Sequence, residues 1–218
     1  MFSEFIHIVK DEVVFASNNT GKLKRMQRLL DSVNVPVLLR TPLEVGILDY
    51  EVIEDGQTLR ENAEKKARAL ASRTSLPIIA DDTGFFIKGA EIDPVTVKRN
   101  ALGGVDERTL PIEVIGQKML AYYQSLASSY GGSVDAEWRN GIYFFTSDRR
   151  GFYVEAIRPS ILTNQVHGKM DPHLPLRPLY KSKATGKYVL EQSDAEELME
   201  LKPIIDALVA LLRNWKGF

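Results

Sequence analysis

The feature that most constrains the fold is a short apolar run that turns directly into a helical pattern. Val13-Val14-Phe15-Ala16 is followed by Ser17-Asn18-Asn19-Thr20-Gly21-Lys22, and apolar residues then recur on one helix face to Asp31. We therefore expect a strand, a tight loop and a helix. Such a loop presents unpaired backbone N–H groups at the positive end of a helix dipole, and Lys22 adds a charge. Phosphate is the anion that this arrangement holds best.

A structural interpretation of the same loop is that Ser17, Asn18 and Asn19 only cap the helix. Helix caps are far commoner than phosphate sites, so the loop taken alone favours capping. It is also not a Walker A loop, which needs Gly at the position of Ala16 and Ser or Thr at that of Leu23. A phosphate site here would belong to another fold.

The remaining pattern predicts an α/β protein with a mixed sheet. Further strands are expected at Val35–Arg40 and Leu76–Ala80, and long helices at Thr58–Thr74, Leu110–Ser128 and about Asp194–Asn214. Three β-rich runs lie between the last two helices: Val134–Arg139, Ile142–Ser147 and Phe152–Ile157. Asn140-Gly141 predicts a hairpin turn between the first two of these runs. Prolines at 172, 175 and 178 predict an extended loop, and residues 88–104 show no clear periodicity.

Composition excludes several classes of function. The chain has 218 residues, enough for one sizeable core or for two lobes that share a sheet. A net charge of −1 gives no general attraction to nucleic acid or to an anionic membrane. The absence of cysteine rules out disulfides, a thiolate nucleophile and cysteine-based zinc sites, and the three histidines are scattered. Neither a signal peptide nor an apolar run of membrane-spanning length is visible, so we expect a soluble, cytoplasmic protein.

A pair of carboxylates follows the predicted strand Leu76–Ala80, in the sequence Asp81-Asp82-Thr83-Gly84. We expect this pair and the Ser17–Lys22 loop to lie at carboxyl ends of strands, where α/β proteins bind ligands. Adjacent carboxylates could bind Mg²⁺, and one could take a proton from water. The alternative is a turn in which one Asp bonds its own backbone.

Two further clusters contain acidic residues. Thr58 and Glu61 have the spacing of a helix capping box, which is a structural explanation for Glu61. That box leaves Glu54, ahead of Gly56, without a structural role, and a free carboxylate near a phosphate loop suggests a second metal ligand. The other cluster, Gly168-Lys169-Met170-Asp171, is explained equally well as part of the proline-rich loop.

Taken together, the first three motifs resemble the inosine-triphosphate pyrophosphatase family, which cleaves non-standard purine nucleoside triphosphates. The resemblance is carried by Ser17–Lys22, Glu54–Ala63 and Ala80–Gly84. In these places the family has Thr/Ser-x-Asn-x-Gly-Lys, Glu-x-Gly-x-Thr-Phe-x-Glu-Asn-Ala and Ala-Asp-Asp-Ser-Gly. Agreement runs from about Val13 to Gly84 and is looser from there to the C-terminus.

The resemblance implies a fold and a reaction. The fold would be a single two-lobed domain over residues 1–218, with a long mixed β-sheet, helices on both faces and a central cleft for the nucleotide, usually as a homodimer. The reaction would be Mg²⁺-dependent hydrolysis of a nucleoside triphosphate to the monophosphate and diphosphate. Glu54 and Asp82 would bind the metal, Asp82 would be the general base, and Thr83 would contact substrate. The triphosphate would be held by Ser17, Asn18, Asn19, Thr20, Gly21 and Lys22.

The segments that read the base differ from the family pattern. The family's Phe-Gly-Tyr-Asp loop is replaced by Gly168-Lys169-Met170-Asp171, which keeps only Asp171 as a substrate contact. The family's Ser-His-Arg is replaced by Leu201-Lys202-Pro203. A third family segment is replaced by Pro94–Ala101. Loss of the stacking aromatic removes about 1–3 kcal/mol of base binding. Trp138 or Tyr143 could supply another ring, although a core role is favoured for both.

These departures leave more than one function open. We expect a pyrophosphatase whose base preference has changed or broadened. The alternative is a non-catalytic nucleotide-binding or regulatory protein that kept the fold. A nucleic-acid binder is a third possibility, against which the balanced charge argues.

Overall fold

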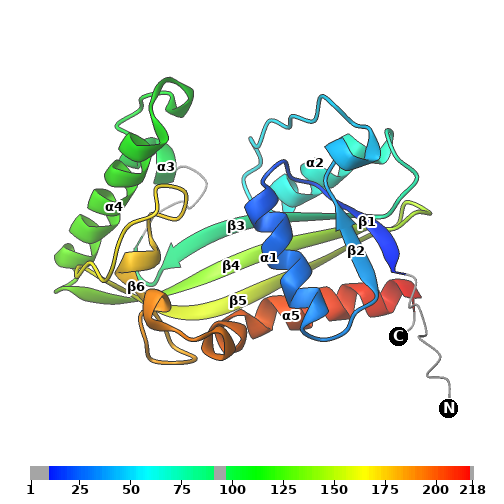
Figure 1. Cartoon of the computed structure of the whole chain (residues 1–218). Helices are drawn as coiled ribbons and strands as arrows, with labels where there is room; N and C mark the ends of the chain where they lie inside the picture. Colours follow the sequence, from blue (N-terminus) through cyan, green and yellow to red (C-terminus); the bar gives the residue numbers. More distant parts are fainter. Residues whose placement is uncertain (1–9, 91–96, 217–218) are drawn as a thin grey trace, which may run out of the picture. The chain divides into compact units, whose positions relative to one another are not determined.

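The computed structural model describes residues 10–90 and 97–216. Six strands among these residues form one sheet in the order β2-β1-β3-β4-β5-β6 (Figure 1). Their bounds are β1 Asp11–Phe15, β2 Val37–Arg40, β3 Ile78–Ile87, β4 Ser133–Phe145, β5 Gly151–Thr163 and β6 Tyr180–Ser182. β1 pairs in parallel with β2 and β3, whereas β5 and β6 are antiparallel. The predicted α/β fold with a mixed sheet is confirmed.

The helices lie close to their predicted positions. Their bounds are α1 Thr20–Asp31, α2 Leu59–Ala71, α3 Val97–Ala101, α4 Ile112–Ser129 and α5 Asp194–Lys216. Thr58 caps α2 by accepting a hydrogen bond from the Glu61 N–H at 3.1 Å, so the predicted cap is confirmed. The short helix α3 was not predicted, because its five residues are too few to show a period. Residues 94–96 lie outside the described residues. They belong to Pro94–Ala101, the segment that replaces a family segment in this sequence.

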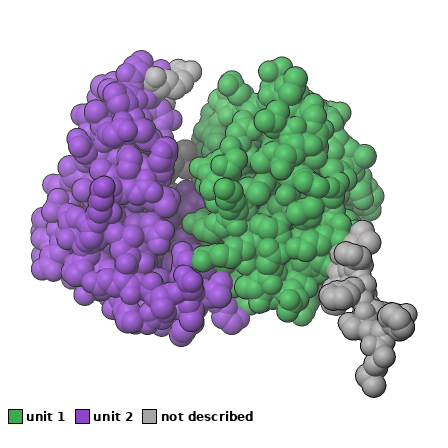
Figure 2. All heavy atoms as spheres, viewed as in Figure 1, with its two compact units in different colours: residues 1–82, 141–156, 204–218 green, residues 83–140, 157–203 purple. Residues whose placement is uncertain are grey.

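The chain divides into two compact units (Figure 2), and each has its own cluster of buried apolar side chains. Unit 1 comprises residues 1–82, 141–156 and 204–218, and unit 2 comprises residues 83–140 and 157–203. We predicted a single domain over residues 1–218 with a central cleft. That prediction depends on how the two units are placed relative to each other, so it stays a prediction. In the parts of the chain that the structure describes, no helix is long and apolar enough to cross a membrane.

Helices cover both faces of the sheet in unit 1. Tyr143 and Phe145 of β4 belong to the same buried cluster as Ala63 and Ala67 of α2. Phe144 lies between them in sequence, and its ring packs edge-on against Trp215 of α5 at 5.5 Å. Because successive side chains of a strand point to opposite faces, α2 and α5 must cover opposite sides. The core of unit 2 gathers side chains of β3, α4 and β5 with residues 176–189.

β3 is longer than the sequence predicts, and this corrects the position of the paired carboxylates. We expected the strand to end at Ala80, ahead of Asp81–Gly84, but β3 continues without a break to Ile87. The pair therefore lies inside a strand that has neighbours on both sides, not at a carboxyl end. Tertiary contacts override the local turn signals here, because Lys22 of α1 pairs with Asp81 and Lys66 of α2 pairs with Asp82. Alternation along the strand sends Asp81 and Asp82 to opposite faces.

The predicted hairpin turn at Asn140-Gly141 is also wrong. β4 runs through both residues, and the actual turn is closed by a 2.9 Å hydrogen bond from the Thr146 N–H to the Arg150 carbonyl. Asn140 is buried and donates its side-chain amide to Thr83 Oγ1 at 2.9 Å. A Cβ on Gly141 would lie 2.9 Å from the Leu59 Cβ and 2.9 Å from the Tyr153 hydroxyl oxygen. The dipeptide thus serves close packing, not a turn.

Candidate functional site

The loop after β1 is organised by its own side chains. Asn19 caps α1, because its Oδ1 accepts the Lys22 N–H at 3.0 Å, and Ser17 Oγ accepts the Asn19 N–H at 3.1 Å. The capping interpretation is therefore confirmed for Asn19. Helix geometry still leaves the N–H groups of Thr20 and Gly21 without an intrahelical acceptor, and both residues are exposed. A Cβ on Gly21 would lie 3.2 Å from Asn19 Oδ1, so a side chain there would crowd the cap.

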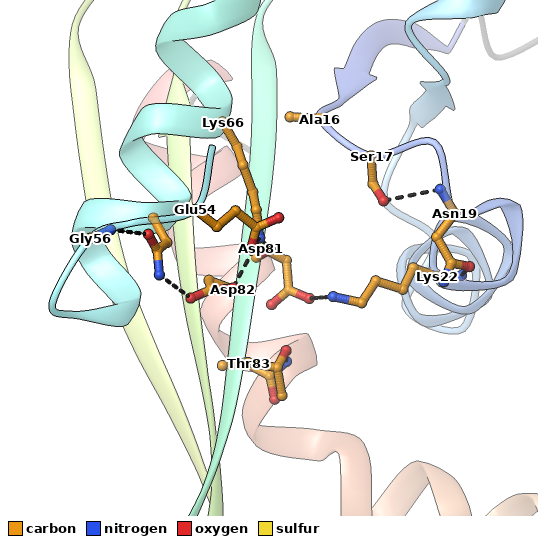
Figure 3. Close-up of polar contacts among 12 residues, drawn as sticks. Ala16, Ser17, Asn19, Lys22, Glu54, Gly56, Lys66, Asp81, Asp82 and Thr83 are labelled. Carbon is orange, nitrogen blue, oxygen red and sulfur yellow. Dashed lines mark hydrogen bonds and ion pairs between the residues drawn. The ribbon is translucent and has the colours of Figure 1, made fainter. Parts of the chain in front are cut away.

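Lys22 extends from the first turn of α1 to β3. Its Nζ lies 3.5 Å from Asp81 Oδ2, and the Asp81 side chain is fully buried (Figure 3). Burial of a carboxylate is costly unless a positive charge is close, so Lys22 is part of what allows Asp81 to lie inside the strand. The contact also joins the loop to the strand that carries Asp82.

Lys66 of α2 is the residue on which the acidic side chains converge (Figure 3). Its Nζ lies 2.7 Å from Glu54 Oε2, 2.9 Å from Asp82 Oδ1 and 3.2 Å from the Asp81 carbonyl oxygen. Three acceptors match the three N–H donors of an ammonium group. Burial is the largest influence on the pKa of Lys66 and lowers it, but the two carboxylates outweigh burial, so the pKa is raised above its usual value. Lys66 is therefore charged at neutral pH.

Asn62 of α2 binds the second carboxylate oxygen of Asp82, the one that Lys66 does not contact. Its Nδ2 donates to Asp82 Oδ2 at 3.2 Å, and its Oδ1 accepts the Gly56 N–H at 2.8 Å. A Cβ on Gly56 would lie 2.6 Å from that Oδ1, so only glycine fits at this approach. Asn62 thereby fixes both Asp82 and the turn that carries Glu54. Residues 62 and 66 are one helical turn apart, so both face β3 from the same side of α2.

Tyr50 connects the loop to α2. Its hydroxyl lies 3.2 Å from the Ala16 carbonyl oxygen and 3.1 Å from that of Lys66, and its own carbonyl accepts Asn18 Nδ2 at 2.9 Å. Burial of the ring raises the pKa of Tyr50, so the hydroxyl keeps its proton and can donate. Sequence reasoning missed both Tyr50 and Lys66. The four-residue spacing from Asn62 could have indicated Lys66, but no local pattern indicates Tyr50.

The carboxylates of Glu54 and Asp82 fit a divalent metal. Oxygens of both lie within 3 Å of one positively charged atom, so the pair already converges on a cation. Mg²⁺ prefers oxygen ligands and commonly takes one or two carboxylates together with water and substrate phosphates. Within the described ranges, no group of three or more metal-ligating His, Cys, Asp or Glu residues occurs. Two carboxylates suit a metal whose remaining ligands are water and the oxygens of a bound phosphate. Asp81, by contrast, is directed to Lys22, so the adjacent Asp81 and Asp82 do not form a shared metal pair.

The remaining predicted residues belong to unit 2. Thr83 Oγ1 accepts from Asn140, as described above, and Asp171 is exposed, with its Oδ1 accepting the His173 N–H at 2.9 Å. Leu201 is buried in α5 and Lys202 is exposed. The structure thus places the loop, Glu54 and Asp82 in unit 1, and Thr83 and Asp171 in unit 2.

Both rings considered as substitutes for the stacking aromatic are packed in cores. Trp138 packs against Phe85 and Tyr180, with ring centroids at 4.7 and 5.6 Å. Tyr143 is buried and packs against Phe145 at 6.2 Å. The core interpretation is therefore supported for both residues.

Comparison with known proteins agrees with the motifs. Residues 13–110 match the model of the Ham1 family. Curated relatives of this chain are described as dITP/XTP pyrophosphatases. That of Vibrio parahaemolyticus is 43% identical over 82 residues, covering 36% of this chain and 39% of the relative. That of Coxiella burnetii is 41% identical over 83 residues, covering 38% and 40%. The matched segment thus spans about two-fifths of the length of these curated relatives.

Solved structures extend the likeness of fold beyond the Ham1-like segment. A HAM1 protein from Coxiella burnetii superposes with a TM-score of 0.71 at 22% identity, over 94% of this chain and 99% of that chain. The Ham1 protein of Staphylococcus aureus gives 0.70 at 20% identity, over 94% and 100%. The resemblance to a pyrophosphatase family is confirmed, with sequence similarity concentrated in the part of the chain that holds the three motifs and a shared fold over nearly the whole chain.

Proposed function

We propose that the protein is a Mg²⁺-dependent nucleoside triphosphate pyrophosphatase, which hydrolyses a triphosphate to the monophosphate and diphosphate. The observation that carries the proposal is the convergence of Glu54 and Asp82 on Lys66, in the same unit as the Lys22 loop. Relatives of this chain are described as dITP/XTP pyrophosphatases, which supports purine triphosphates of this kind as substrates.

Different residues of unit 1 have different roles in this proposed reaction. The exposed N–H groups of Thr20 and Gly21, together with Lys22, bind phosphate oxygens at the start of α1. Glu54 and Asp82 hold the metal, which when bound neutralises phosphate oxygens and lowers the pKa of water. Asp82 also accepts the proton of the attacking water at a carboxylate oxygen. Asn62 keeps that carboxylate in place through Oδ2.

The base preference is altered or broadened in this proposal. Met170 stands where the family has an aromatic residue, and Leu201-Lys202-Pro203 stands where it has Ser-His-Arg. Lys202 is exposed and can offer a point charge to a base oxygen, but not the planar fork of an arginine. Asp171 and Thr83 remain as substrate contacts in unit 2. Loss of a stacked ring weakens the binding of every base, because each base has a π-face, whereas loss of hydrogen-bonding side chains weakens the discrimination between bases.

A panel of substrates tests the proposal. The protein is incubated with Mg²⁺ and the triphosphates of inosine, xanthosine, deoxyuridine and the standard nucleosides, and phosphate is measured after an added pyrophosphatase. We expect turnover of inosine or xanthosine triphosphate. We also expect weaker discrimination against the remaining triphosphates than in an enzyme that is specific for non-standard purines. No turnover of any substrate would contradict the proposal. Calorimetric binding without turnover would support the non-catalytic alternative.

Further proposals follow from the same family likeness. We propose that two copies associate as a homodimer, that the protein acts in the cytoplasm, and that it binds neither nucleic acid nor membrane. A net charge of −1 supports the last point. Light scattering coupled to gel filtration measures the association directly, and a monomer at micromolar concentration would contradict it.

A further inference from the structure

The Glu54 and Asp82 carboxylates are held by an internal cation, the Lys66 ammonium. The two oxygens lie 2.7 and 2.9 Å from Nζ, and the Asp81 carbonyl takes the remaining donor at 3.2 Å. The Lys66 side chain is 10% exposed and that of Asp82 13% exposed, so solvent screens this pair little. The Glu54 side chain is 49% exposed, so solvent reaches one member of this three-residue cluster. Its net charge is that of two carboxylates and one ammonium, which is −1.

A divalent ion cannot simply be added to this arrangement. An ion that ligates both carboxylates must approach the atoms that Lys66 bonds, and the two positive centres then repel each other at close range. Displacement of Lys66 without a new anionic partner is also costly, because its ammonium is buried and would lose its hydrogen bonds. A triphosphate supplies such a partner, since it brings several negative charges beside the Lys22 loop.

We propose that Lys66 competes with the divalent metal for Glu54 and Asp82, so that these carboxylates accept the metal tightly only when a triphosphate draws Lys66 away. This inference rests on the proposed function for the identity of the metal and the triphosphate. It predicts that metal and nucleotide bind with positive coupling. The role of Lys66 is that of a positioning residue that makes metal binding depend on substrate.

Metal binding without nucleotide tests the inference. Mn²⁺ is titrated into the full chain and followed by calorimetry and by electron paramagnetic resonance. In the variant Lys66→Met the competing charge is lost, and we expect Mn²⁺ to bind at least about tenfold more tightly than to the wild type. Lys66→Gln, which keeps a donor for the Asp81 carbonyl, is measured in parallel and serves where the Met variant does not fold. An affinity equal to or weaker than that of the wild type would overturn the proposal.

The matched control is Lys65→Met. Lys65 is the preceding residue on α2 and is ion-paired as well, but with the exposed Asp55 at 2.5 Å. We expect this variant to bind Mn²⁺ as the wild type does, and an equal gain there would overturn the proposal by showing a general charge effect. Adding Glu54→Gln to Lys66→Met should abolish the gain. If the gain persisted, Mn²⁺ would be binding elsewhere and the inference would fail.

Turnover by the wild type separates this inference from the proposed function. A wild type that hydrolyses no triphosphate, combined with tighter Mn²⁺ binding by Lys66→Met, contradicts the function and supports the competition. Turnover by the wild type without that gain contradicts the competition alone.

Discussion

Asp82 is the side chain on which the proposed chemistry depends, because it is both a metal ligand and the proton acceptor. Asp82→Asn keeps the size of the side chain and removes its charge. We expect turnover of inosine triphosphate to fall by about a hundredfold or more, since general base catalysis contributes roughly that much. Nucleotide binding, measured by calorimetry, should remain detectable.

Asp55→Asn is the control for this change, because Asp55 is an exposed carboxylate close in sequence to Glu54 and pairs with Lys65. It should leave turnover within about twofold of the wild type, as exposed ion pairs contribute little. Unchanged turnover in Asp82→Asn would place the base elsewhere.

Lys22 binds phosphate in this account, so its loss should act on substrate binding. In Lys22→Ala we expect KM to rise by more than kcat falls, because an interaction made equally in ground and transition states affects KM alone. Steady-state kinetics with inosine triphosphate measures both constants. Lys24→Ala, an exposed lysine two residues further along α1, is the control and should change neither. A fall in kcat alone would show that Lys22 acts on the transition state.

At the residue scale, the sequence identified the side chains that have a family motif and missed those that act through tertiary contact. The motifs predicted Glu54 and Asp82, and the structure brings them together. Lys66 was not predicted, because its partners lie 12 and 16 residues away in the chain and only tertiary packing brings them together. The turn interpretation of Asp81 failed for the same reason, since its partner Lys22 comes from α1.

At the element scale, Tyr50 joins the end of β1 to α2. Tyr50→Phe removes a hydroxyl that lies within hydrogen-bond distance of the Ala16 and Lys66 carbonyls, and it keeps the ring in the core. We expect the free energy of unfolding to fall by about 1 kcal/mol, the net value of a typical buried hydrogen bond. Chemical denaturation measures it.

Tyr130→Phe is the matched control, because Tyr130 is exposed and also bonds a backbone carbonyl, that of Gly89 at 3.3 Å. Its effect should stay below about 0.5 kcal/mol, as surface changes usually do. Equal effects in the two variants would contradict the joining role of Tyr50.

Helices were predicted better than strands, and particular residues show why. α1 is set by local signals, namely the Asn19 cap and a buried stripe that includes Met26 and Leu29. The lengths of β3 and β4 depend on neighbours, because Asp82 in β3 and Asn140 in β4 each contact a partner distant in the chain. Turn chemistry read from such residues in isolation is therefore misleading.

At the scale of the whole molecule, the residues proposed for phosphate chemistry and some of those proposed for base recognition fall in different units. The Lys22 loop, Glu54, Lys66 and Asp82 belong to unit 1, whereas Asp171 and Lys202 belong to unit 2. The sequence matches the Ham1 family over residues 13–110, which contains all of the first group and none of the second. A chain with this division can keep the reaction while its preference among bases changes.

The central claim is that the protein hydrolyses the phosphoanhydride bond between the α- and β-phosphates of a nucleoside triphosphate. Phosphorus NMR of inosine triphosphate incubated with the wild-type protein and Mg²⁺, without any added pyrophosphatase, tests this claim most directly. The account predicts inosine monophosphate and diphosphate in equal amounts. Release of orthophosphate with inosine diphosphate, or an unchanged triphosphate at high protein concentration, would contradict it.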